Sequence, residues 1–297
     1  MKYARIIAAV IDQVWAIDPV KARAMLEFLA FAAAGGQVSA EEAKKITPRR
    51  EQKIANAPGG VAVIPIFGIL AQHASLMSSI SDPSTASTDQ IGRQISAAAA
   101  DPEVKAIVLR VESPGGSVYG LQEFADRIFE ARQSKPVIAQ VDSYAASAAY
   151  WAASQASEIV VSPGGDVGSI GVYTVHEDVS RALEAEGITE TLVYSGKHKV
   201  EGNPFAPLSD EARAHLQERV DTAHQDFVAA VARGRGVDTG VVAERFGQGR
   251  MVRAEEALKR GMADRIATLD ETLARFKPTP SSGRDRQRAR LALASKT

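Results

Sequence analysis

The stretch VKAIVLRVESPGGS at residues 104–117 decides the fold class. Its first eight residues, Val104–Val111, are mostly apolar and β-branched, which predicts a strand buried on both faces. A proline and two glycines then form a turn, and the apolar residues of Val118–Arg132 recur at helical spacing. A buried strand that leads through a glycine turn into a helix is typical of α/β proteins.

The same alternation of strand and helix continues on both sides of this stretch. Connections of this length between apolar strands predict crossover units and a largely parallel sheet. The predicted strands are 61–66, 104–111, 136–141, 158–161 and 189–194, and the predicted helices begin near Ser87, Val118, Ala145 and Ser209.

Changes in composition divide the chain into four parts. An N-terminal helical arm is predicted over residues 1–46, because residues 21–34 have a helical pattern that ends at two glycines. Residues 47–60 are polar and contain prolines, so we predict a linker. The main domain is predicted over residues 61–275. Residues 276–297 are basic and rich in small residues, which predicts a disordered tail.

The overall composition excludes several classes of protein. The chain has 297 residues, 45% of them hydrophobic, and its 35 basic and 36 acidic residues give a net charge of -1. A near-neutral charge argues against nucleic-acid binding as the main function. The absence of cysteine excludes disulfides, zinc–thiolate sites and cysteine nucleophiles.

Membrane and metal motifs are also missing from the sequence. No apolar stretch approaches the ~18 residues of a membrane span, so we expect a cytoplasmic protein. The five histidines never recur at the spacing of helical metal ligands, so no metal site is predicted.

Three stretches contain residues that can carry chemistry. The first is the turn Ser113–Ser117, where a glycine pair before a helix lets backbone N–H groups face a phosphate or a developing oxyanion. An ordinary strand-to-helix turn is the alternative. Ser162–Gly165 repeats the first four residue types without a strong helix after it.

The second stretch surrounds Ser147 in the sequence SYAASAAYW, residues 143–151. The small residues on both sides would let a substrate backbone approach the serine hydroxyl, and a helix that begins there would direct its positive end to the same place. The alternative is an alanine-rich core helix whose serine bonds to its own backbone.

The third stretch, Ser195–Phe205, contains Lys197, His198 and Lys199. A lysine can act as the general base for a serine if burial disfavours its charged form. His198 leaves a serine–histidine pair open. A solvated basic turn is the alternative that involves no chemistry.

The order and context of these stretches resemble the signal peptide peptidase A family of the Clp-protease/crotonase-like superfamily. Within it, the chain is most similar to phage head maturation (prohead) proteases of the phage lambda protein C type, which have a single peptidase unit. The resemblance implies a spiral of ββα units with a largely parallel sheet. It extends over residues 61–269 and rests on residues 113–118, 145–150, 167–172 and 196–199, and the similarity to the phage type rests also on residues 195–207.

For the reacting groups, the resemblance implies that Ser147 is the nucleophile. Lys199, rather than Lys197, would be the general base, and Ser169 would orient the lysine. No metal and no cofactor are implied.

For the oxyanion hole, the resemblance implies the backbone N–H groups of Gly116 and Ala148. One departure lies here, because Ala148 and Ala149 follow the nucleophile where relatives commonly have a glycine pair. Alanine still supplies an N–H group, although it tolerates fewer backbone conformations than glycine.

The predicted function is a serine endopeptidase with a Ser–Lys dyad that processes scaffold and capsid proteins as a homo-oligomer, in the host cytoplasm or inside the phage prohead. One alternative is a soluble bacterial relative that digests peptides released from membranes. Another is a capsid-assembly protein without activity. A crotonase-like acyl-CoA enzyme would need carboxylates near the glycine turn, for which Glu112 and Glu123 are available. Self-trimming of the C-terminal tail is a further hypothesis.

Overall fold

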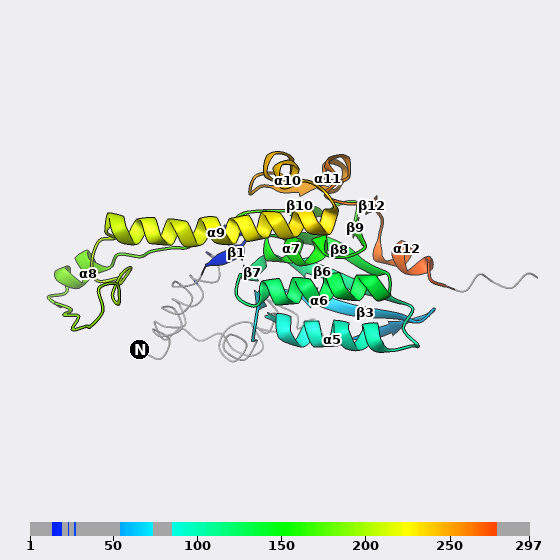
Figure 1. The fold of residues 1–297 in the computed structure, drawn as a ribbon, viewed down its shortest axis with the longest axis horizontal. Helices are drawn as coiled ribbons and strands as arrows, with labels where there is room; N and C mark the ends of the chain where they lie inside the picture. The colour runs from blue at the N-terminus through cyan, green and yellow to red at the C-terminus, as the bar shows by residue number, and fades with distance from the viewer. Residues whose placement is uncertain (1–13, 20–22, 24–26, 28–53, 74–84, 278–297) are drawn as a thin grey trace, which may run out of the picture.

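A largely parallel β-sheet lies at the centre of the protein, and the long helix α9 (Asp210–Arg235) extends well beyond it (Figure 1). The structure, a computed structural model, describes residues 14–19, 23, 27, 54–73 and 85–277. Strands and helices alternate through most of these residues, which confirms the predicted α/β class.

The central sheet is built on three long parallel strands, β3 (Val61–Phe67), β6 (Ala106–Ser113) and β8 (Val137–Ala146). β6 lies between the other two and pairs with both. Its apolar residues are fully buried, as expected for a strand that is covered on both faces. Shorter strands complete the sheet: β2 (Ala55–Ala57), β9 (Glu158–Val161), β10 (Asp166–Gly168), β11 (Met251–Arg253) and β12 (Arg265–Ile266).

Helices connect these strands, as the sequence pattern predicts. The side chain of Ser87 caps α5 (Thr88–Ala100) by accepting the N–H of Gln90, and Ser209 caps α9 by accepting the N–H of Ala212. α9 ends at Gly236, whose φ of 66° suits a glycine. The other helices are α6 (Leu121–Ser134), α7 (Ala148–Ser154), α8 (Ser180–Ala185), α10 (Thr239–Arg245), α11 (Ala254–Arg260) and α12 (Leu269–Ala274).

A second sheet follows the end of β6. Its four strands lie in the order β1 (Trp15–Ile17), β7 (Gly115–Ser117), β4 (Leu70–Ala71) and β5 (Ala86–Ser87). β7 is parallel to β4 and antiparallel to β1. The glycine turn that the sequence singles out is therefore part of a sheet, and an N-terminal strand lies beside it.

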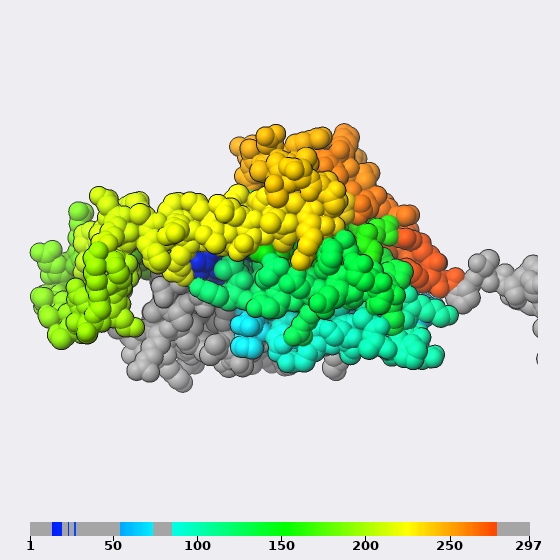
Figure 2. All heavy atoms as spheres, viewed as in Figure 1, coloured from blue at the N-terminus to red at the C-terminus, as the bar shows by residue number. Residues whose placement is uncertain are grey.

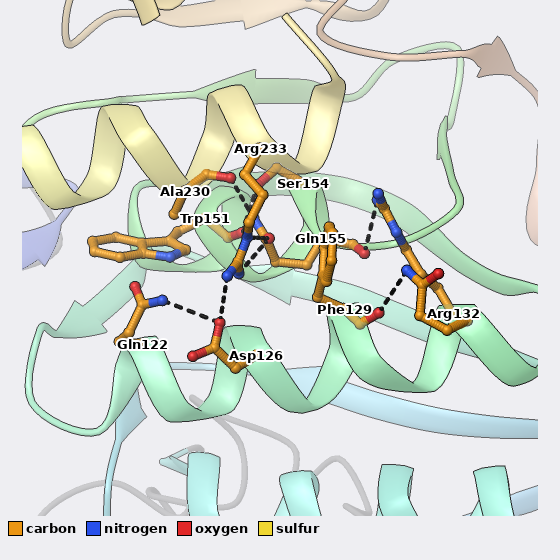
Figure 3. A network of polar contacts seen from close by, with 10 residues as sticks. Gln122, Asp126, Phe129, Arg132, Trp151, Ser154, Gln155, Ala230 and Arg233 are labelled. Atoms are coloured by element: carbon orange, nitrogen blue, oxygen red, sulfur yellow. Dashed lines mark hydrogen bonds and ion pairs between the residues drawn. The ribbon is translucent and has the colours of Figure 1, made fainter.

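Stacking and a buried polar network fix the C-terminal half of α9 to α7 (Figure 3). The ring of Trp151 stacks on Phe227, with 4.8 Å between the ring centroids. The buried side chain of Gln155 donates to the carbonyl of Ala230 (2.9 Å) and accepts from the guanidinium of Arg233 (2.8 Å). A satisfied buried network specifies one arrangement of its elements, so this half of α9 has a fixed position on α7.

Residues 175–209 form a projecting segment that includes α8 and lies at the N-terminal end of α9 (Figure 1). The predicted strand Thr189–Tyr194 is wrong, because these residues are exposed and have no regular structure. A strand needs a neighbouring strand for its backbone N–H and C=O groups. Within the described part of the protomer, no strand lies beside this stretch.

The N-terminal residues contribute more to the sheets than the sequence pattern suggests. Trp15–Ile17, inside the predicted helical arm, form β1, and Ala55–Ala57, inside the predicted linker, form β2 beside β3. Most of the predicted arm and the tail beyond residue 277 lie outside the described residues. Among the helices of the described ranges, none is long and apolar enough to cross a membrane.

Candidate active site

Ser147 stands at a sharp turn between β8 and α7. Its φ of 54° and ψ of −119° are costly for a residue with a side chain. The Ser147 N–H donates to the carbonyl of Gly168 (2.7 Å), and the Ser147 carbonyl accepts from the N–H of Trp151 (2.9 Å). A strained serine where a buried strand meets a helix has the geometry of a nucleophile elbow.

The hydroxyl of Ser147 is completely buried in the protomer. Its Oγ donates to the carbonyl of Gly171 at 3.3 Å. Among the described hydrogen bonds of this hydroxyl, none involves a lysine, a histidine or a carboxylate. The protomer therefore presents a positioned serine without a base bonded to it.

The glycine turn of β7 lies against the Ser147 turn. A Cβ at Gly115 would lie 2.9 Å from the carbonyl oxygen of Ala146 and 3.0 Å from the nitrogen of Ala148. A Cβ at Gly116 would lie 1.9 Å from the carbonyl oxygen of Leu70. Both positions require glycine, and the close approach brings the backbones of Gly116 and Ala148 to the same end of β8. Ser113 shapes this turn, as its Oγ donates to the carbonyl of Gly68 (2.6 Å).

Backbone strain gathers around the same place. Within the described residues, the non-glycine residues with positive φ are Ser147, Ser169 and Gln248. Ser169 follows β10, beside Ser147, and its N–H donates to the carbonyl of Arg250 (3.0 Å). Strained residues persist where surrounding structure holds them, and they cluster at functional sites.

A cleft of about 460 Å³ is lined in part by Gly171, whose carbonyl accepts from the Ser147 hydroxyl. One wall is the stretch after Ser169, which includes Gly171, and the other wall is α9. Gln248, the third strained residue, lies at this cleft. Its apolar lining includes Ile170, Val172, Val220 and Val228.

The family model for peptidase family S49 matches residues 130–279, just over half of the chain. The chain belongs to peptidase family S49. This match includes Ser147, the stretch around Ser169 and the projecting segment.

Three curated proteins with similar sequences support this membership. "Capsid assembly protease C" of Escherichia phage lambda is 34% identical over 226 residues, which cover 75% of this chain and 50% of that protein. "Head-tail preconnector protein GP5" of Enterobacteria phage P21 is 32% identical and covers 76% of this chain and 44% of that protein. "Putative signal peptide peptidase SppA" of Enterococcus faecium is 32% identical, with 58% of this chain and 50% of that protein covered.

The S49 chain spans about half the length of these curated relatives. Among solved structures, a ClpP1 variant from Listeria monocytogenes matches with a TM-score of 0.43 and 12% identity, covering 71% of this chain and 94% of that one.

In this S49 chain, Lys199 is exposed on the projecting segment rather than buried beside Ser147. Lys197, two residues earlier, forms an ion pair with Glu211 in the first turn of α9 (2.6 Å). Glu211 lies 16 residues before Phe227, the residue that packs on α7. At 1.5 Å per residue, about 24 Å of helix separates the two positions.

The structure therefore brings together only part of the set that the sequence predicts. Gly116, Ala148 and Ser169 lie around Ser147. The projecting segment, which contains Lys199, lies at the distant end of α9 (Figure 1). The pairing of this lysine with the serine stays a prediction.

The neighbours of Lys199 have other partners. The hydrogen bond and charge of Glu211 raise the pKa of Lys197, which keeps its amine protonated. His198 contacts the carboxylate of Glu201 through Nδ1. His198, Glu201 and Glu211 place possible metal-ligand atoms within 4.8 Å of one another, in a group that is largely exposed.

The strand Trp15–Ile17, which the sequence pattern does not predict, pairs with the glycine turn at the site. Its signal is a short apolar run that ends at Asp18. Trp15 pairs with β7 on one side and with Tyr173 on the other. Burial, with a further contribution from the charge of Asp18, raises the pKa of Tyr173 to about 12, so this phenol stays neutral.

Proposed function

We propose that the protein is a serine endopeptidase that uses Ser147 as its nucleophile. The observation that carries the proposal is the strained elbow of Ser147, held between a buried strand and a helix beside the glycine turn. In acyl transfer, the serine oxygen attacks a peptide carbonyl, the amine leaves, and water then releases the acyl chain. Because buried residues hold the Ser147 hydroxyl in one position, it is oriented for attack without further loss of entropy.

The backbone N–H groups of Gly116 and Ala148 are the proposed oxyanion hole. Backbone donors at fixed positions stabilise the charge that develops on the carbonyl oxygen, and removal of one such donor costs about 100- to 1,000-fold in rate in other proteases. Supporting this role, Gly116 has no space for a side chain and the nitrogen of Ala148 faces the same turn.

We propose that Lys199 reaches Ser147 from a neighbouring protomer. A lysine acts as a base in its neutral form, and an exposed amine in water favours the charged form. The fixed position of α9 on α7 keeps the projecting segment of one protomer away from its own serine. A second copy that covers the segment would bury the amine and complete the dyad.

Exposed apolar residues on the projecting segment support contact with a second copy. Val193 is 95% exposed and Tyr194 is 54% exposed, which is unusual for side chains of this kind without a partner. The other large apolar side chains exposed there are Val175, Ile188, Leu192 and Phe205.

For the biological role, we propose the processing of capsid and scaffold proteins in phage head maturation. The names of the two phage relatives support this role. The relative named as a signal peptide peptidase supports the alternative of a bacterial protease that digests membrane-released peptides. Co-expression with phage capsid and scaffold proteins as candidate substrates would separate the two, because only the first role predicts their cleavage.

Replacement of Ser147 by alanine tests the activity itself. Ser147→Ala is expected to abolish cleavage of a denatured protein substrate while circular dichroism and oligomer mass stay unchanged. Ser143→Ala is the matched control, because Ser143 lies on the same strand and is exposed. Undiminished cleavage by Ser147→Ala would reject the nucleophile. A wild-type protein without activity would favour a non-catalytic assembly protein.

A further inference from the structure

The N-terminal strand β1 lies between β7, which contains the glycine turn, and Tyr173, in the stretch after Ser169. On one side it is antiparallel to β7, and on the other side Trp15 exchanges two hydrogen bonds with Tyr173 (2.9 and 3.0 Å). Both partners belong to the proposed active site. The strand is therefore hydrogen-bonded on both edges, as a bound peptide is in β-strand addition.

The register places one residue of β1 opposite the proposed oxyanion donor Gly116. Ala16 lies opposite Gly116, and backbone hydrogen bonds join Val118 to Val14 (3.4 Å) and Asp18 to Pro114 (2.8 Å). Hydrogen-bonded pairs recur at every second residue of an antiparallel ladder. Ala16 and Gly116 are therefore such a pair, and the carbonyl of Ala16 faces the N–H of Gly116.

The surroundings of the Ala16 carbonyl agree with this register. A Cβ at Gly115 would lie 2.2 Å from the Ala16 oxygen and 3.0 Å from the nitrogen of Ala148. The Ala16 oxygen and the Ala148 nitrogen, the second proposed oxyanion donor, therefore both lie beside Gly115. Ala16 and Ser147 are each completely buried, and Ile17 is nearly so. Figure 2 shows the described N-terminal residues, which include β1, as a small blue patch beneath α9.

We propose that Val14–Asp18 is an internal substrate segment and that the enzyme cleaves its own chain between Ala16 and Ile17; this inference rests on the proposed function. Ser147 Oγ adds to the carbonyl carbon of Ala16 and loses its proton to the base. The C–N bond then breaks, and the proton passes to the nitrogen of Ile17, which becomes a new N-terminus. Water hydrolyses the Ala16 ester and restores the serine.

Two consequences follow for other substrates. While β1 is paired with both β7 and Tyr173, no second peptide can take its place, so the segment must leave before another substrate binds. The buried position of Ala16 also has room for a small side chain only. The substrate class is therefore an extended peptide with a small residue on the acyl side of the cleaved bond.

Intact-mass measurement and N-terminal sequencing of the full-length protein test the proposal. The wild type is expected to lose residues 1–16 and to begin at Ile17, and Ser147→Ala is expected to keep these residues. Ala16→Ser should still be cut, because serine is small. Ala16→Trp should lower this cleavage about tenfold or more, since an indole overfills a buried position.

A denatured protein substrate in the same tubes separates the two proposals. If the wild type digests that substrate and keeps the Ala16–Ile17 bond, the internal substrate segment is rejected and the endopeptidase stands. Efficient cleavage after residue 16 in Ala16→Trp would also reject it. If neither substrate is cut, the proposed function fails and this inference fails with it.

Discussion

The two parts of the proposed dyad lie in very different surroundings. Ser147 is fully buried at the end of a ten-residue strand, whereas Lys199 lies on a projecting segment where Val193 is 95% exposed. Core packing around the serine holds a backbone conformation that a flexible loop would relax. By contrast, none of the described residues 175–209, which form the projecting segment around Lys199, is fully buried. The proposed nucleophile is thus held by the core of a single chain, whereas the proposed base is exposed on that chain.

This contrast explains where strain and exposure occur in the molecule. Strained φ angles at Ser147 and Ser169 are stabilised by bonds to neighbouring backbone, at 2.7 Å and 3.0 Å. Burial of a valine or a tyrosine contributes roughly 1.5–3 kcal/mol. The exposed apolar side chains of the projecting segment would gain this free energy only if an interface buried them. The segment that carries the exposed Lys199 therefore also has side chains that would favour association with a second copy.

The largest effect on stability and activity is expected at the glycine turn of β7, beside Ser147. Gly116→Ala would place a Cβ 1.9 Å from the Leu70 carbonyl oxygen, which belongs to the backbone and cannot turn away. We expect a loss of about 3 kcal/mol in the free energy of unfolding and no activity. Chemical denaturation measures this change.

The second Ser-Pro-Gly-Gly sequence provides the control for this prediction. A Cβ at Gly164 meets nothing within 4 Å, so Gly164→Ala should change stability by less than about 0.5 kcal/mol. Equal effects of Gly116→Ala and Gly164→Ala would show that the two turns do not differ as described.

The next largest effect is a loss of activity expected from replacing Lys199 on the projecting segment. Lys199→Ala should lower kcat by about 100-fold or more with an unchanged melting temperature, because the exposed amine adds nothing to the packing of its own protomer. Lys197→Ala, at the residue paired with Glu211, should keep most of the activity. The reverse order of the two variants would move the base to Lys197.

A smaller effect is expected from the apolar surface of the projecting segment. Val193→Ser removes apolar area without a change in the protomer core, so the dissociation constant of the oligomer should rise about tenfold. Activity per chain should then fall on dilution. Sedimentation across a concentration series measures the fractions of single chain and oligomer. An unchanged dissociation constant in Val193→Ser would show that this surface takes no part in assembly.

The smallest effect is a pH dependence of stability at Asp264, which joins the end of α9 to β9. Burial raises the pKa of the Asp264 carboxyl, but the hydrogen bonds from Arg235 and the Ile159 N–H and the charge of Arg235 outweigh it, so the pKa lies below its ordinary value. A carboxyl with a lowered folded pKa adds stability above its unfolded pKa of about 3.9 and loses it as pH falls through the folded value.

Asp264→Asn should therefore be less stable than the wild type at pH 7, and the difference should shrink below about pH 4. Denaturant midpoints at several pH values measure it. A constant difference between pH 7 and pH 3 would contradict the assigned shift.

The sequence predicted the elements that the core stabilises. Strands near 61–66 and 158–161 and the long helix from Ser209 agree with the structure, because their apolar periodicity and caps report directly on burial. The glycine turn and the serine elbow were found in the same way, since each follows a buried strand.

Other features depended on neighbours that the sequence pattern does not reveal. Residues 189–194 have the apolar residues of a strand, but their backbone finds no strand beside it in the described protomer. Trp15–Ile17 form a strand only because β7 and Tyr173 lie on either side. The distance between Ser147 and Lys199 follows from the docking of α9, which no local motif encodes.

Co-expression of two inactive variants tests the shared dyad most directly. Lys199→Ala keeps the serine and Ser147→Ala keeps the lysine, so random assembly restores about a quarter of the wild-type activity if the two groups meet across protomers. Co-expression of Lys197→Ala with Ser147→Ala checks mixing and should give about half, because half of the serines remain. We predict the quarter-level activity. Mixed oligomers of Lys199→Ala and Ser147→Ala without activity would contradict the account and place both groups in one chain.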